Sequence, residues 1–191
     1  EAAMAMAAVN DPASSHAERD DPRWDDAVDE HRTALAAFLD SAEGLREDAW
    51  KAPWGAGKWT RAQVAEHLSL VYEAAIRELM TGQGLPVKVS PFRQKLLRWV
   101  VLPHILFHRS IPLRPPSPRE TRPGEVTAPR AQVLRRLREL GERFEHEMER
   151  AHRAGRAQLT HPFFGTIAGA RAMRFVAVHL EHHTRQVASG T

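Results

Sequence analysis

Three histidines stand within the C-terminal stretch HLEHHTRQV, residues 179–187. His179 and His183 are four positions apart, so on a helix they project from one face about 6 Å apart, a spacing that lets two imidazoles bind one transition metal. His182 is rotated by about 100° from His183 and cannot share the full site; His183 is preferred because it falls on an apolar stripe. The competing interpretation is a solvated helix face, so a metal site requires a third ligand from another part of the chain.

His67, in the phrase WTRAQVAEHL, is the best candidate for this third ligand because it lies beside Leu68 on the apolar face of a predicted helix. Its alternative role is that of a core-edge histidine that is hydrogen-bonded to a carbonyl group or to water. Helical bundles can hold a metal between facing helices, and three neutral imidazoles with an open fourth position are typical of a catalytic ion. Zinc, nickel and iron all suit such a set of ligands.

Composition limits the chemistry that is available. The chain has 191 residues, of which 42% are hydrophobic, enough for one domain with a sizeable core. It has 11 histidines and no cysteine, which excludes disulfides and thiolate ligands and leaves nitrogen and oxygen to bind a metal. Residues 1–21 lack a basic start and a long apolar run, so we expect a flexible leader rather than a signal peptide, and a cytoplasmic protein.

The charge distribution does not favour a nucleic-acid partner. The net charge of +3 arises from 27 basic and 24 acidic residues, which is nearly balanced. The arginines that follow residue 108 are interleaved with proline and glutamate rather than with aromatic residues that stack on bases. An exposed helix face and connector explain them better than a nucleic-acid or anionic substrate site.

The spacing of apolar residues predicts four main helices. Thr60 and Gln63 have the form of a capping box, which indicates that the second helix begins there, and Gly190 can end the last one. We find no useful β-alternating run, and four helices of this length suit an all-α four-helix bundle. The predicted helices span residues 24–46, 60–80, 129–154 and about 166–189.

Three segments between these helices are less regular. Residues 47–60 hold three tryptophans and two glycines, so we expect a non-helical connector that folds over the end of the bundle. Residues 91–108 form an apolar piece that we expect Pro103 to interrupt. They are too short for a membrane span, and a packed helix or a partner contact, including a homodimer, is favoured over a membrane-surface contact. Residues 109–129 are rich in proline and predict an extended connector.

Other polar side chains near the candidate ligands have structural interpretations that we favour. Glu66 and Glu181 could hydrogen-bond an imidazole, but solvated helix positions are favoured. Tyr72 could donate a proton near the site, but packing at the edge of the core is favoured. His161 precedes a proline, which favours a role in leading into the last helix. His104 and His108 form a second i,i+4 pair. They follow a proline and lack a third ligand, so we leave them out of the predicted site.

The motifs resemble those of the DinB-like superfamily of metal-binding four-helix bundles, which includes thiol-dependent S-transferases and the mycothiol-dependent maleylpyruvate isomerase. The resemblance covers roughly residues 24–80 and 130–189 and leaves out the leader and the proline-rich insertion. The motifs that carry it are KWTRAQVAEHL at 58–68, THPFFGTI at 160–167 and HLEHHTRQV at 179–187.

The resemblance implies a single bundle domain over residues 22–191, with an inserted helix and proline-rich connector at about 85–129, and one divalent metal on His67, His179 and His183. It further implies a metal-dependent enzyme that acts on a small molecule and is thiol-dependent and transferase-like, with a metal-activated thiol or water as nucleophile. Because the chain has no cysteine, the thiol would be a low-molecular-weight cofactor. The alternative is a non-enzymatic metal-binding or protein-interaction bundle in which the insertion contacts a partner.

Overall fold

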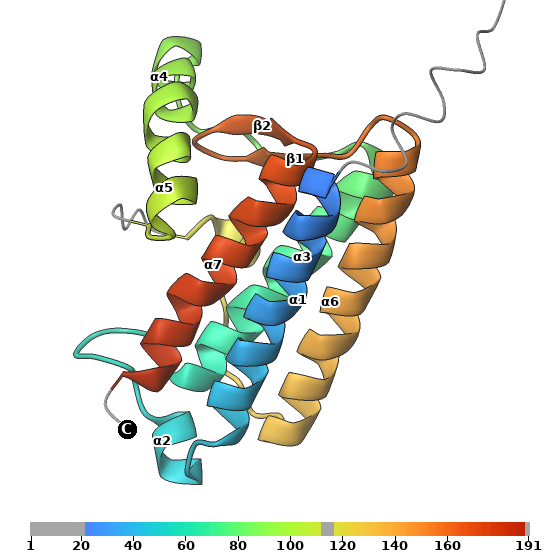
Figure 1. Ribbon diagram of the computed structural model, residues 1–191. Helices are drawn as coiled ribbons and strands as arrows, with labels where there is room; N and C mark the ends of the chain where they lie inside the picture. The colour runs from blue at the N-terminus through green and yellow to red at the C-terminus, as the bar shows by residue number, and fades with distance from the viewer. Residues whose placement is uncertain (1–21, 112–116, 190–191) are drawn as a thin grey trace, which may run out of the picture.

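Four long helices form the bundle in this computed structural model, which describes residues 22–111 and 117–189 (Figure 1). α1 packs mainly against α7, and α3 packs mainly against α6. The predicted all-α four-helix bundle is therefore confirmed, while the expected flexible leader and the helix end at Gly190 lie outside the described residues. The four long helices are α1 (Pro22–Glu43), α3 (Arg61–Thr81), α6 (Arg130–Arg153) and α7 (Ala170–Ala188).

Local signals fix both ends of α3. The Thr60 hydroxyl oxygen accepts a hydrogen bond from the Gln63 backbone at 3.1 Å, and the Gln63 side chain accepts one from the Thr60 backbone at 3.0 Å, so the predicted capping box is formed. At the other end Gly82 adopts the left-handed conformation with φ 74°, which a side chain would disfavour. The register of α3, and with it the direction of each of its side chains, is set locally.

Each long helix contributes a large side chain to a common core. Phe38 on α1, Tyr72 on α3, Phe144 on α6 and Met173 on α7 are each at most 2% exposed. Truncating a residue of this kind to alanine typically costs about 2–5 kcal/mol of unfolding free energy. The bundle is therefore a well-packed frame on which polar side chains can be held in fixed positions.

The connector after α1 differs in part from its prediction. Residues 47–51 form a short helix, α2 (Glu47–Lys51), where no regular helix was expected. Trp50 explains the difference, because one helical turn brings this side chain into the core, where it is 2% exposed. The predicted position is confirmed, since α2 lies at one end of the bundle (Figure 1).

The apolar insertion forms a continuous helical rod. It runs from α4 (Pro91–Leu96) through the π-helical turn η1 (Leu97–Val101) into α5 (Leu102–His108). The expected interruption at Pro103 was wrong: this proline stands in the first turn of α5, and the wider π turn before it leaves room for a ring that has no N–H to donate. No helix in the described ranges is long and apolar enough to cross a membrane.

Both the core and an ion-pair network hold this rod. Ile105 on α5 is 1% exposed and belongs to the main hydrophobic core. Arg109 ends α5 with φ 48°, and its guanidinium donates to Glu30 on α1 at 2.6 Å and to Glu181 on α7 at 3.0 Å. Glu30 also accepts from Arg174 on α7 at 3.1 Å. The insertion is thereby tied to two helices of the bundle.

A β-hairpin precedes the last helix, so the expectations of no strand and of a helix from about Thr166 were wrong. β1 (Gln158–His161) pairs antiparallel with β2 (Gly165–Ala168), with Leu159 opposite Ile167. Gly169, at φ 57°, then turns the chain so that α7 begins at Ala170. Strands of four residues are too short for an alternating pattern to be recognised, which explains why the hairpin was missed.

Candidate metal centre

The three predicted ligands come together between α3 and α7. One ring nitrogen from each of His67, His179 and His183 lies within 4.8 Å of the others. The ring centroids are 5.4 Å apart for His67 and His179, 5.0 Å for His67 and His183, and 4.6 Å for His179 and His183. Within the described part of the chain no other group of three His, Asp or Glu residues has this geometry. The predicted convergence of these three residues is confirmed.

Helix geometry explains how the rings meet. His179 and His183 are one turn apart on the same face of α7, and His67 faces them from α3, whose register the capping box fixes. His67 and His183 are 5% and 6% exposed, whereas His179 keeps more of its surface accessible. His179 is thus the least buried of the three residues.

A backbone carbonyl orients the ring of His67. Nδ1 of His67 lies 2.6 Å from the carbonyl oxygen of Thr121, and because a carbonyl only accepts, this nitrogen carries the proton. The lone pair of the neutral ring is then on Nε2, the nitrogen left for the cluster. Thr121 belongs to a short 3-10 helix, η2 (Arg119–Thr121), and is 2% exposed. The proline-rich segment, which was predicted only as a connector, therefore supplies part of the site.

A glutamine orients the ring of His183 in the same way. Nδ1 of His183 donates to Oε1 of Gln186 at 2.8 Å, and Nε2 of Gln186 donates to Nε2 of His182 at 2.9 Å. The proton on Nδ1 leaves the lone pair of His183 on Nε2. Gln186 was not predicted as a partner of His183. Its place three residues later on the same helix puts the two side chains within reach of each other, and this spacing could have identified it.

The donor set fits a divalent cation. Nε2 of His179 lies 2.9 Å from Nε2 of His183; because the lone pair of His183 is on Nε2, Nε2 of His179 donates this hydrogen bond, and a bound ion would take the place of its proton. Burial, followed by the neighbouring imidazoles, holds the pKa of His179 and of His183 well below 6.5. Burial also lowers the pKa of His67, against the opposing effect of its bond to Thr121. Three neutral imidazoles that are desolvated, two of them oriented by hydrogen bonds through Nδ1, match the requirements of a transition metal.

Two aromatic side chains border the histidine cluster. The ring of Trp59 lies 5.1 Å from that of His67, and the ring of Phe175 lies 6.5 Å from that of His179. Both side chains are partly exposed. They offer partly exposed apolar surface beside the cluster, against which a small molecule could pack.

The flanking carboxylates have partners other than the imidazoles. Glu66 accepts hydrogen bonds from Arg136 at 2.8 and 2.9 Å, and Glu181 accepts from Arg109 at 3.0 Å. Both carboxylates therefore form ion pairs with arginines, whereas simply solvated positions were expected. These ion pairs engage the carboxylate oxygens that would otherwise be free to orient an imidazole. Tyr72 is a core residue, as favoured from the sequence, because it is 2% exposed and lies within α3.

The remaining histidines lie outside the cluster. His161 ends β1, and its Nδ1 accepts from the backbone N–H groups of Phe163 and Phe164 at 3.3 and 3.4 Å. Its role is structural, as expected, although it serves the hairpin turn rather than the start of a helix. His104 and His108 have ring centroids 4.3 Å apart on the exposed side of α5, and they gain no third ligand in the described ranges.

Comparisons with known proteins agree with this architecture. A family model described as the DinB superfamily matches residues 13–187. No curated protein matched the sequence. Among solved structures, YfiT from Bacillus subtilis, described as "a probable metal-dependent hydrolase with an unusual four-helix bundle topology", has a TM-score of 0.56 at 18% identity, over 88% of this chain and 85% of that chain. At this level of identity the likeness concerns the fold.

Proposed function

We propose, from the premise that this chain belongs to the DinB superfamily, that it is a metal-dependent enzyme which acts on a small molecule. The observation that supports this function best is the convergence of three imidazole nitrogens within 4.8 Å in a desolvated setting. When bound there, a divalent ion would keep its positive charge and lower the pKa of a water or thiol presented to it.

The protein's own contribution is to hold the lone pairs of two of the three ligands in place before the ion arrives. Thr121 fixes the proton of His67 on Nδ1, and Gln186 does the same for His183. Depressed pKa values keep the rings neutral, so protons compete less with the ion. Zinc, nickel and iron remain the candidate ions.

A low-molecular-weight thiol is our first choice of nucleophile, and water is the second. The resemblance to thiol-dependent S-transferases supports the thiol, which must be a separate molecule because the chain has no cysteine. The description of YfiT as a probable metal-dependent hydrolase supports water. Trp59 and Phe175 border the cluster with apolar surface, which favours a substrate with an apolar portion in either reaction.

Metal content tests the site independently of any reaction. Elemental analysis of untagged protein should find about one divalent ion per chain, and the His179→Ala variant should lose it. His146→Ala is the matched control, because this histidine is exposed on α6 and should leave the metal content unchanged. Metal-free protein of unchanged stability, or equal loss in both variants, would remove the proposed site.

Turnover then separates enzyme from binding module. The metal-loaded protein should accelerate the thiol-dependent loss of an electrophile such as an activated haloarene, and His179→Ala should not. Hydrolysis of activated esters without thiol would instead support water as nucleophile. If the protein binds metal but accelerates neither reaction, the non-enzymatic bundle becomes the better description.

A further inference from the structure

The helical rod formed by α4, η1 and α5 carries an unusual amount of exposed apolar surface. Seven large hydrophobic residues are exposed in the described ranges, and five of them lie on this rod. Single exposed residues of this type are ordinary, but a concentration on one element marks an interaction surface. The five residues, named here the apolar ridge, are Phe92 (81% exposed), Leu96 (53%), Trp99 (63%), Val100 (60%) and Phe107 (82%).

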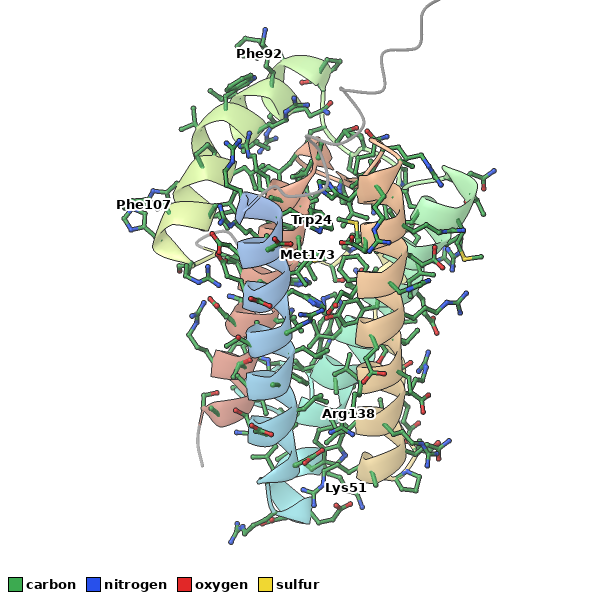
Figure 2. The ribbon with its side chains drawn as sticks, turned by 45° about the vertical axis from the view of Figure 1, so that its right-hand side comes forward. Trp24, Lys51, Phe92, Phe107, Arg138 and Met173 are labelled. Carbon is green, nitrogen blue, oxygen red and sulfur yellow. The ribbon has the colours of Figure 1, made fainter. Side chains whose placement is uncertain are left out.

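The ridge occupies one side of the rod. Phe92, Leu96 and Trp99 follow one another at spacings of four and three, which places them on one helix face. The opposite side is used by the bundle, since Leu102 and Ile105 are each 1% exposed. The sticks in Figure 2 show Phe92 and Phe107 pointing away from the body of the bundle. One side of the rod therefore packs on the bundle, and the other side presents a convex apolar surface.

Positive charge surrounds the ridge. No aspartate or glutamate stands between Glu78 and Glu120 in the sequence. Arg93, Lys95 and Arg98 are exposed on the rod, and none of the ion pairs in the described part of the chain involves them. The charged side chains of the rod itself are therefore all cationic.

We propose that the apolar ridge docks this protein on an anionic lipid surface. Exposed aromatic and aliphatic side chains bordered by Arg and Lys match the composition of helices that lie in the interface of a bilayer. Trp99 and the two phenylalanines would enter the boundary between headgroups and acyl chains, while Arg93, Lys95 and Arg98 would reach lipid phosphates. No spanning helix is needed, which agrees with the absence of one in the described ranges.

Shape and charge favour lipid over a second copy of the chain. A convex edge inserts into a deformable surface, whereas a protein partner needs a complementary groove. A symmetric dimer through this face would pair two rods whose own charged side chains, Arg93, Lys95 and Arg98 among them, are all cationic, and like charges at an interface cost affinity. An anionic bilayer can deform around the ridge and attracts the positive charge of the rod.

Vesicle binding by the full chain tests the proposal. The protein should float with vesicles of equal parts phosphatidylcholine and phosphatidylglycerol, and not with phosphatidylcholine alone. Replacing Arg93, Lys95 and Arg98 with glutamine should weaken partitioning roughly a hundredfold, since each cation near an anionic surface contributes about a fivefold gain. The same replacement at three exposed arginines elsewhere is the control, which should change binding little: Arg77, Arg135 and Arg171.

A second set of variants tests whether the apolar side chains of the ridge contribute to vesicle binding. Substituting serine for Phe92, Trp99 and Phe107 together should abolish vesicle binding, while Met80→Ser, which changes a 54% exposed residue on α3, should not. All of these side chains are exposed, so circular dichroism should report an unchanged fold. Absence of binding to both vesicle types would overturn the proposal, as would sedimentation velocity that reveals a dimer abolished by the serine variant. The experiment does not depend on the metal centre, so either proposal can fail alone.

Discussion

Gln186 accepts a hydrogen bond from Nδ1 of His183 at 2.8 Å, and this contact fixes which nitrogen of the ring faces the metal centre. Partners of this kind typically contribute about 10–100-fold to metal affinity. Gln186→Ala should therefore weaken metal binding by about that factor, measured by titration against a chromogenic chelator, without loss of helix content. Gln132→Ala, an exposed glutamine on α6, is the control. Equal affinities for the two variants would show that Gln186 does not position the ligand.

Removing the metal should lower the melting temperature, because an ion on the three histidines would join α3 to α7 in the folded state only. At a free metal concentration of about one hundred times Kd the linkage contributes about 2.7 kcal/mol, or roughly 5–10 °C for a domain of this size. Scanning calorimetry with and without a chelator measures the shift. The His179→Ala variant should melt at the same temperature in both conditions; a chelator effect that persists there would place the stabilising ion elsewhere.

The sequence predicted that the three histidines meet, because the spacing of residues within a helix determines which of them share a face. His179 and His183 share a face by spacing alone, and the capping box at Thr60 sets the direction of His67. The contact between His67 and Thr121 joins residues 54 positions apart and uses a backbone oxygen. No side-chain type signals such a bond, so it could not be anticipated.

The incorrect secondary-structure predictions lie where local sequence patterns and tertiary contacts favour different structures. Pro103 normally ends a helix, yet the π turn at Leu97–Val101 carries the rod past it. Most of the second strand was assigned to the last helix, because Thr166 to Ala168 are compatible with either state in isolation. Pairing with Gln158–His161 and the turn at Gly169 decide for the strand, and both depend on contacts that a pattern does not contain.

Arg61 is a buried residue that no sequence motif singled out. It is 4% exposed, and its guanidinium donates to the carbonyl oxygens of Val187 at 2.9 Å and Ala49 at 3.3 Å, and also to that of Ser189. Arg61→Met should lower the unfolding free energy by about 3 kcal/mol, because several carbonyls lose their donor. Urea denaturation measures this loss. Arg77→Met, at an exposed position of the same helix, should change stability by less than about 0.5 kcal/mol; similar losses in both would refute the role of Arg61.

His31 should make stability depend on pH below neutrality. Its ring is 1% exposed and bonded to the Tyr72 hydroxyl at 2.7 Å, and burial lowers its pKa from 6.5 to about 4, against the effect of Glu145. The unfolded chain therefore takes up the proton first, so stability falls as pH drops below 6.5, and about 3 kcal/mol is lost by pH 4. In urea melts between these pH values, His31→Gln should reduce the slope relative to wild type, whereas exposed His146→Gln should preserve it. Parallel slopes for wild type and His31→Gln would mean that this ring is protonated equally easily in both states.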